Sequence, residues 1–117
     1  MSLTQTLVAG PTAVGPGIKM AIYDVAFDSS YPTGGEPLDC SSEFTYVYGV
    51  TFAGNDTSAD NKFVFNAIIP APTTACSSSN VTIQAWLGGT TDAVLEEEGN
   101  ATDLSAIGQM AVIVYGV

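Results

Sequence analysis

Residues 44–53 read Phe-Thr-Tyr-Val-Tyr-Gly-Val-Thr-Phe-Ala and carry the clearest β-strand pattern in the chain. Successive side chains of a strand point to opposite faces of its sheet. One face therefore collects the large apolar side chains, which are Phe44, Tyr46, Tyr48, Val50 and Phe52. We interpret this stripe as the inner face of a sandwich strand, with a carbohydrate-stacking platform as the alternative. The hydroxyl groups of its two tyrosines need partners, which favours positions near a sheet edge or a subunit interface.

Shorter runs of the same kind lie on both sides of this segment. Val, Ile, Thr, Tyr and Phe dominate these runs, and Gly, Pro, Ser and Asn separate them. The pattern predicts further strands over residues 3–8, 18–27, 62–69, 81–87 and 110–115, the first of them ending at Gly10-Pro11. In the acidic stretch 90–105 it predicts one short helical turn, over residues 93–98. Several short strands without a long helical pattern predict an all-β fold, either an antiparallel β-sandwich or a small barrel.

The length of 117 residues allows a single domain. We expect residues 18–117 to form this β-sandwich domain. Residues 1–17, with few charges and two Pro/Gly breakers, are expected to form an extended N-terminal arm that adds a strand to a partner, or an edge strand of the chain's own sheet. A long loop over residues 28–39 is stiffened by Pro32 and Pro37.

The charge balance excludes several classes of function. The chain has 12 acidic residues, two basic residues (Lys19 and Lys62) and no histidine, which gives a net charge of -10. A nucleic-acid surface needs clustered Lys and Arg, so we expect no nucleic-acid partner. Catalytic triads and metal sites built on histidine are impossible. We therefore predict that the protein is not an enzyme, with no catalytic residue, no metal-binding residue and no cofactor.

The beginning of the chain, Met-Ser-Leu-Thr-Gln-Thr-Leu-Val-Ala-Gly, lacks the basic and apolar regions of a secretory signal. The longest apolar run, Met110 to Tyr115, has the length of a strand and not of a membrane helix. These features predict a soluble product made in the cytoplasm, unless a leader has been removed, and no membrane partner.

Two local features leave alternatives open. Cys40 and Cys76 lie in serine-containing, loop-like segments and form either one disulfide after release into an oxidising medium or two free thiols. Asp56 and Asp60 share one oxygen-rich loop, which is either an ordinary acidic turn or a calcium site, although the spacing is not that of an EF-hand.

Two further features concern the surface. Trp86 falls on the polar face of its predicted strand, where it is either an interface anchor or packed under a loop. The run Glu96-Glu97-Glu98 is interpreted as a solvated loop, with an electrostatic role toward a basic partner as the alternative.

Two stretches resemble a known kind of protein. They are Ser-Tyr-Pro-Thr-Gly-Gly-Glu-Pro-Leu at 30–38, and Gly-Asn-Ala-Thr-Asp-Leu-Ser at 99–105, which leads into the last strand at 110–116. They resemble small structural proteins of tailed bacteriophages, nearest to the capsid decoration (cement) proteins of short-tailed and cyanobacterial phages.

The resemblance implies a β-sandwich or jelly-roll-like protomer that forms a homotrimer, binds the major capsid protein on the outer head and strengthens the shell. The implied location is the virion, after assembly in the host cytoplasm. Two alternatives stay open: a carbohydrate-binding or adhesin module, and a small head-completion or tail protein. The resemblance supplies no residue assignments. From the arm, the loop 28–39 and the lone tryptophan we predict the interface residues Leu3, Leu7, Val8, Tyr31, Pro32, Leu38 and Trp86.

Overall fold

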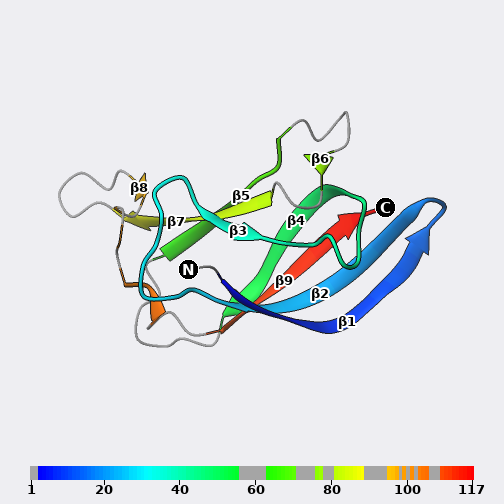
Figure 1. Cartoon of the computed structure of the whole chain (residues 1–117), viewed down its shortest axis with the longest axis horizontal. Coiled ribbons are helices and arrows are strands. Elements are labelled where there is room, and N and C mark those ends of the chain that lie inside the picture. The colour runs from blue at the N-terminus through cyan, green and yellow to red at the C-terminus, as the bar shows by residue number, and fades with distance from the viewer. Residues whose placement is uncertain are drawn as a thin grey trace.

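The computed structural model describes residues 3–55, 63–70, 76–77, 81–88, 95–97, 99, 101, 103–105 and 109–117. These residues form two antiparallel sheets that share one core (Figure 1). The first sheet has the order β1 (Thr4–Gly15), β2 (Ile18–Ala26), β9 (Gln109–Gly116), β4 (Tyr46–Asn55) and β6 (Cys76–Ser77). The second has the order β3 (Glu36–Leu38), β7 (Val81–Gly88) and β5 (Phe63–Ile68), and β8 (Leu95–Glu97) also pairs with β7. The predicted all-β fold is confirmed, and the described strands form a sandwich and not a closed barrel.

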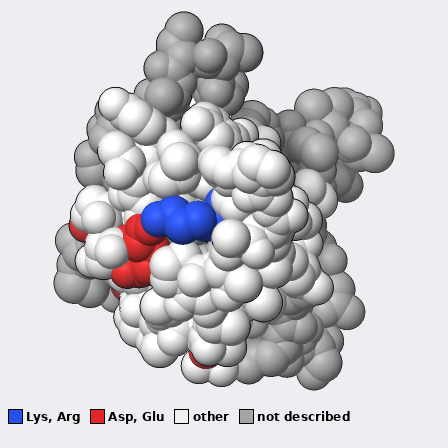
Figure 2. Space-filling model, turned by 90° about the vertical axis from the view of Figure 1, so that its right-hand side faces the viewer, with Lys and Arg blue, Asp and Glu red and all other residues white. Residues whose placement is uncertain are grey.

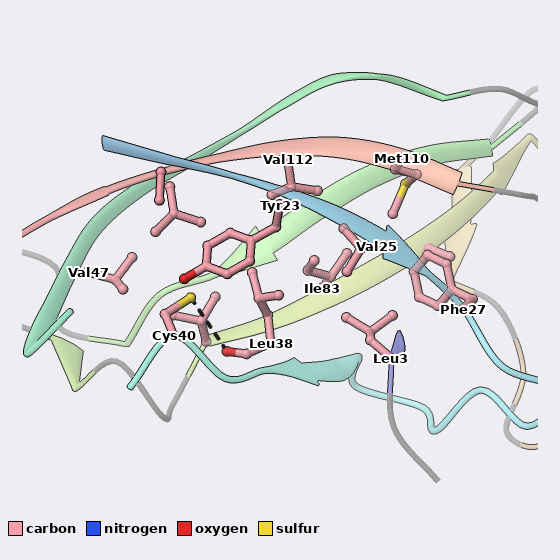
Figure 3. Close-up of a cluster of buried hydrophobic side chains, with 14 of the residues drawn as sticks. Leu3, Tyr23, Val25, Phe27, Leu38, Cys40, Val47, Ile83, Met110 and Val112 are labelled. Atoms are coloured by element: carbon pink, nitrogen blue, oxygen red, sulfur yellow. Dashed lines mark hydrogen bonds between the residues drawn. The ribbon is translucent and has the colours of Figure 1, made fainter. Parts of the chain in front are cut away.

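The core lies between the two sheets and follows the two-residue period of the strands (Figure 3). In β2 every second side chain from Ala21 to Val25 is buried, and in β7 Val81, Ile83 and Ala85 are completely buried. Three phenylalanines extend the core, because Phe27 and Phe65 stack with ring centroids 5.7 Å apart and the Phe65 centroid lies 5.9 Å from that of Phe52. The buried cluster consists of Leu3, Ala21, Tyr23, Val25, Phe27, Tyr31, Leu38, Cys40, Phe44, Val47, Val81, Ile83, Ala85, Leu104, Met110, Val112 and Val114.

The first strand does not end at Gly10-Pro11, as the sequence predicted, but continues to Gly15 at the edge of the five-stranded sheet. An edge position suits proline, because the missing N–H removes no hydrogen bond from the interior of the sheet. The register between β1 and β2 shifts near this point, and the peptide bond between Gly10 and Pro11 is cis. Gly10 has a φ of 86°, and a Cβ there would lie 2.6 Å from the carbonyl oxygen of Met20, so only glycine fits.

β4 departs from the predicted aromatic stripe because its register with β9 shifts after Val47, which inserts Tyr48 as an extra residue. A one-residue bulge reverses the face to which the following side chains point. Val47 is buried on one side of the bulge, and Val50 and Phe52 pack against the core on the other side. The interpretation of the whole stripe as a buried face is therefore wrong for Tyr46 and Tyr48, which are both exposed.

Two predicted loops contain short strands. The segment 28–39 includes β3, which pairs with β7 over residues 81–83. Pro37 is tolerated there because its exposed position lies in a strand at the edge of the small sheet. In the region where we predicted a helical turn, residues 95–97 form β8, which pairs with the far end of β7. Cys76, predicted in a loop, belongs to the two-residue strand β6.

The molecule is elongated, with principal extents of 47 × 27 × 25 Å. Figure 1 shows the cause: the β1–β2 hairpin, in blue, extends beyond the smaller sheet at the end where the C-terminus lies. Among the described residues, no strand of the smaller sheet therefore lies against that end of the five-stranded sheet. Among the described residues, no helix has the length and apolar character needed to cross a membrane.

Candidate interaction surface

The projecting hairpin carries large apolar side chains in contact with solvent. Val8 is 62% exposed and Val14 is 51% exposed, and Leu7 and Ile18 are also exposed. The register of β1 with β2 shifts between Leu7 and Ala9 and again between Ala13 and Gly15, so Val8 and Val14 are the extra residues of two bulges. Bulges interrupt the regular spacing of an edge strand and oppose continuous pairing with another strand. β1 therefore presents apolar side chains and is not suited to add a long strand to a partner.

Strand β4 contributes two aromatic side chains to the same end of the molecule. Tyr46 and Tyr48 are 41% and 43% exposed, and they flank Val47, which pairs with Gly116 of β9. Gly116 also pairs with Lys19 of β2, which directly follows Ile18. Val14, Ile18, Tyr46 and Tyr48 are therefore all found at the end of the sheet where the hairpin turns. We call these four residues the tip surface.

The tip surface is uncharged in a strongly acidic protein. No side chain of β1 or of the hairpin turn is ionisable, and Lys19 is the one cation among the described residues. The Lys19 ammonium group donates a 2.8 Å hydrogen bond to the carbonyl oxygen of Glu43 and lies 5.5 Å from the ring centroid of Phe44. Figure 2 views this end of the molecule: the blue lysine lies beside acidic side chains, and most of the remaining described surface is uncharged.

Hydrogen bonds hold the base of the hairpin in place. The side-chain amide of Gln5 donates to the carbonyl oxygen of Asp39 at 2.6 Å and accepts from the Asp39 N–H at 3.0 Å, as a neighbouring strand would. On β2 the Tyr23 hydroxyl donates to the Glu43 carboxylate at 2.5 Å. Burial, followed by this bond to Glu43, raises the pKa of Tyr23, which keeps its hydroxyl a donor. The hairpin is thus anchored near the core and solvent-exposed at its end.

The segment after β2 is fixed against the small sheet by Tyr31 and Glu97. The Tyr31 hydroxyl donates to the Glu97 carboxylate at 2.8 Å and accepts the N–H of Ala85 at 3.1 Å. The N–H of Gly34 donates to the same Glu97 oxygen at 2.6 Å. Burial raises the pKa of Tyr31, so this hydroxyl also stays protonated. Glu97 thus holds this segment in place and is not part of a solvated acidic run.

The predicted interface residues fall into three groups. Leu7 and Val8 are exposed on β1. Pro32 and Trp86 are partly buried, and the Trp86 indole N–H donates to the Gln84 side-chain oxygen at 3.2 Å. The remaining three are core residues and cannot contact a partner in this conformation; they are Leu3, Tyr31 and Leu38. The sequence did not show that these three side chains are buried, because an apolar residue in an irregular segment can point either inward or outward.

Val14 and Ile18 are absent from the contact residues that the sequence predicted. The available signal was the Gly15-Pro16-Gly17 turn between them, which marks the end of a hairpin. What the sequence did not reveal is that Val14 is the extra residue of a bulge and that Ile18 lies on the face of β2 that points away from the small sheet.

The other candidate sites are only partly described. Cys40 is completely buried, and its thiol lies 3.9 Å from the carbonyl oxygen of Leu38. The side chain of Cys76 lies outside the described residues, and so does the Asp56/Asp60 loop, so the disulfide and the calcium alternative are not tested. Among the residues that are described, no group of three or more acidic or cysteine side chains is arranged to hold a metal ion.

Comparisons with protein families, with curated proteins and with solved structures found no match to this chain. The geometry of the tip surface and the resemblance in the sequence are therefore the two bases for a functional proposal.

Proposed function

We propose that the chain is a virion structural protein, a capsid decoration protein that binds the outer surface of a phage head through its tip surface. The observation that carries this proposal is an exposed, uncharged apolar surface at the end of a projecting hairpin, in a protein with a net charge of -10. Apolar side chains gathered at one end of a soluble domain are typical of protein contact surfaces. Valine, isoleucine and tyrosine gain free energy when a partner removes them from water.

The charge distribution supports a different role for the uncharged tip than for the acidic remainder of the surface. A protein that is present in many copies on one shell must avoid random association, and a large net negative charge opposes it. The uncharged tip is where this repulsion is weakest. We therefore propose the tip for contact with the major capsid protein and, as the resemblance implies, with neighbouring copies in a homotrimer. The function requires binding alone and no chemical step.

The experiment is co-sedimentation of the protein with undecorated heads of the virus that encodes it. Val14→Asp places a charge on the tip surface and should weaken head binding by about tenfold or more, because a carboxylate buried in the contact loses its hydration. Val64→Asp is the matched control: Val64 is also 51% exposed but lies on β5 in the other sheet, and this variant should bind as the wild type does. Normal binding by Val14→Asp, or loss of binding by Val64→Asp alone, would contradict the proposal.

Deletion of the N-terminal segment is a poor test of the same idea. Residues 2–16 contain the buried side chain of Leu3 and the whole of β1, which pairs with β2 along its length. Their removal would open the core and expose a new sheet edge. Single substitutions on the tip avoid this complication.

The position of the protein in the particle distinguishes decoration from the head-completion or tail alternative. A decoration protein occurs in many copies spread over the head, whereas a completion or tail protein occurs in a few copies at one vertex. Quantitative mass spectrometry of purified particles measures the ratio to the major capsid protein. A ratio of a few copies per particle would replace the decoration proposal with the completion or tail alternative.

Carbohydrate binding is the second candidate function, and the exposure of Tyr46 and Tyr48 favours it. Exposed aromatic rings are the groups on which sugar rings stack. A glycan array with the wild type and with Tyr48→Ala tests this candidate. A signal that disappears in the variant would support a carbohydrate-binding module, and an array without signals would remove this candidate.

A further inference from the structure

Two acidic side chains interact in the interior, and three of their oxygens have no donor among the described residues. Glu36 begins β3, pairs with the core residue Ile83 and is completely buried. Within the described part of the chain, neither of its carboxylate oxygens has a hydrogen-bond partner, and the same holds for the buried Oδ2 atom of Asp28. Buried acceptors without partners are rare because they lose their hydration without compensation.

Among the described residues, the neighbouring groups do not satisfy these oxygens. The other oxygen of Asp28 accepts the Ser30 N–H at 2.8 Å. Tyr31 donates its proton to Glu97, which also accepts the N–H of Gly34. From β7, Ile83 pairs with Glu36 and is apolar, and Gln84 points to the opposite face of the strand, where its oxygen accepts from Asn66 at 3.1 Å.

The electrostatic environment of Glu36 favours its neutral form. Burial raises the pKa of Glu36 to about 7, and the next causes are the charge of Asp28 and the close approach of its carboxyl group. The backbone of Asp28 favours the ionised form, but this effect ranks lower. A proton on Glu36 turns one of two facing acceptors into a donor, so that one Glu36 oxygen and Asp28 Oδ2 form a hydrogen bond in place of two unpaired acceptors.

We propose that Glu36 and Asp28 share one proton in the folded protein and that loss of this proton opens the segment from Asp28 to Leu38. The two acids stand at the end of β2 and the start of β3, so their contact closes the loop between them. Without the proton, two carboxylates face each other through buried oxygens, and β3 is the short edge strand that can separate from β7. Opening exposes Tyr31 and Leu38, two predicted contact residues that the closed form buries.

The direction of the pH effect follows from the raised pKa. An acid whose pKa is higher in the folded state than in the unfolded state stabilises the fold while it is protonated. This stabilisation is complete below the unfolded value near 4.5 and is lost as the pH rises through about 7. The chain has no histidine, so few other side chains titrate between pH 5 and pH 7.5. This pH response rests on Glu36 and Asp28 and does not depend on the proposed function.

Hydrogen exchange of the intact protein at pH 5 and pH 7.5 tests the proposal, after correction for the intrinsic effect of pH on exchange. In the wild type, amides of residues 30–38 should become less protected by about tenfold or more at the higher pH, while those of β9 stay protected. Glu36→Gln carries a permanent donor toward Asp28 and should remove this dependence. Asp39→Asn is the matched control, because it removes an exposed acid from the same segment and should leave the dependence unchanged.

The Glu36 carboxyl signal in carbon-detected NMR of the wild type gives a second readout that needs no variant. A midpoint near neutral pH supports the shared proton, and a midpoint near 4.5 would overturn it. Equal protection of residues 30–38 at the two pH values in the wild type would also overturn it. Calcium chloride at pH 7.5 is a further arm: saturable protection that Glu36→Gln abolishes would show that the pair binds a metal ion instead of a proton.

Discussion

The two faces of β2 have opposite surroundings. Ala21, Tyr23 and Val25 point toward the small sheet and are buried, whereas Ile18 points to the other face of the strand and is 41% exposed. Among the described strands, β3, β5 and β7 lie against the first of these faces (Figure 1). Burial along β2 is thus decided by the face on which a side chain lies. The covered face provides stability, and the exposed face is available for a partner at the tip.

The largest expected difference in the free energy of unfolding is between alanine variants of two isoleucines, one in the core and one at the tip. Ile83→Ala leaves a cavity in the closed core and should lower the free energy of unfolding by about 2–5 kcal/mol. Ile18→Ala at the tip should change it by about 0.5 kcal/mol or less. Urea denaturation of both variants measures the contrast. Equal losses would mean that the tip is packed as tightly as the core.

A smaller difference in stability is expected between phenylalanine variants of two tyrosines, one buried and one exposed. Tyr31→Phe leaves the buried N–H of Ala85 without an acceptor and removes a donor from Glu97, so the loss should be about 1–3 kcal/mol. Tyr48→Phe removes a hydroxyl group from an exposed ring and should have almost no effect on stability. Thermal unfolding followed by circular dichroism is sufficient to compare them. If Tyr48→Phe proves the more damaging variant, the assignment of these regions is wrong.

The smallest change in stability is expected for a substitution at the base of the hairpin. Gln5→Ala removes both hydrogen bonds to the backbone of Asp39, but the site is exposed, so water replaces them and the loss should be about 1 kcal/mol or less. The local consequence should be clearer, because the Asp39 amide loses its acceptor and should exchange faster with solvent. Unchanged exchange of this amide would show that Gln5 does not anchor β1.

Sequence patterns predicted the regular parts of the fold and missed the irregular ones. The alternation in β2 and β7 was sufficient to identify these strands, because each has one covered face. The pattern in β4 was misleading since the extra residue Tyr48 reverses the face, and the local sign of that bulge is the glycine that follows it, Gly49. The strands at 36–38 and 95–97 depend on pairing with β7, a contact between distant segments.

The candidate surface was predictable only in part. Leu7 and Val8 are exposed, as a contact role requires, whereas Tyr31 and Leu38 are held in the core by residues far along the chain. One example is the bond from Tyr31 to Glu97, which joins positions 66 residues apart. The sequence identifies apolar residues in a loop, but the direction in which they point depends on such distant partners.

The contact of the tip surface with the capsid can be tested by hydrogen exchange of the protein bound to phage heads, compared with the free protein. If the tip surface makes this contact, residues 12–20 and 46–48 should gain protection, and exchange in β5 and β7 should stay unchanged. Protection confined to β5 and β7, with the hairpin end as open as in the free protein, would contradict this contact.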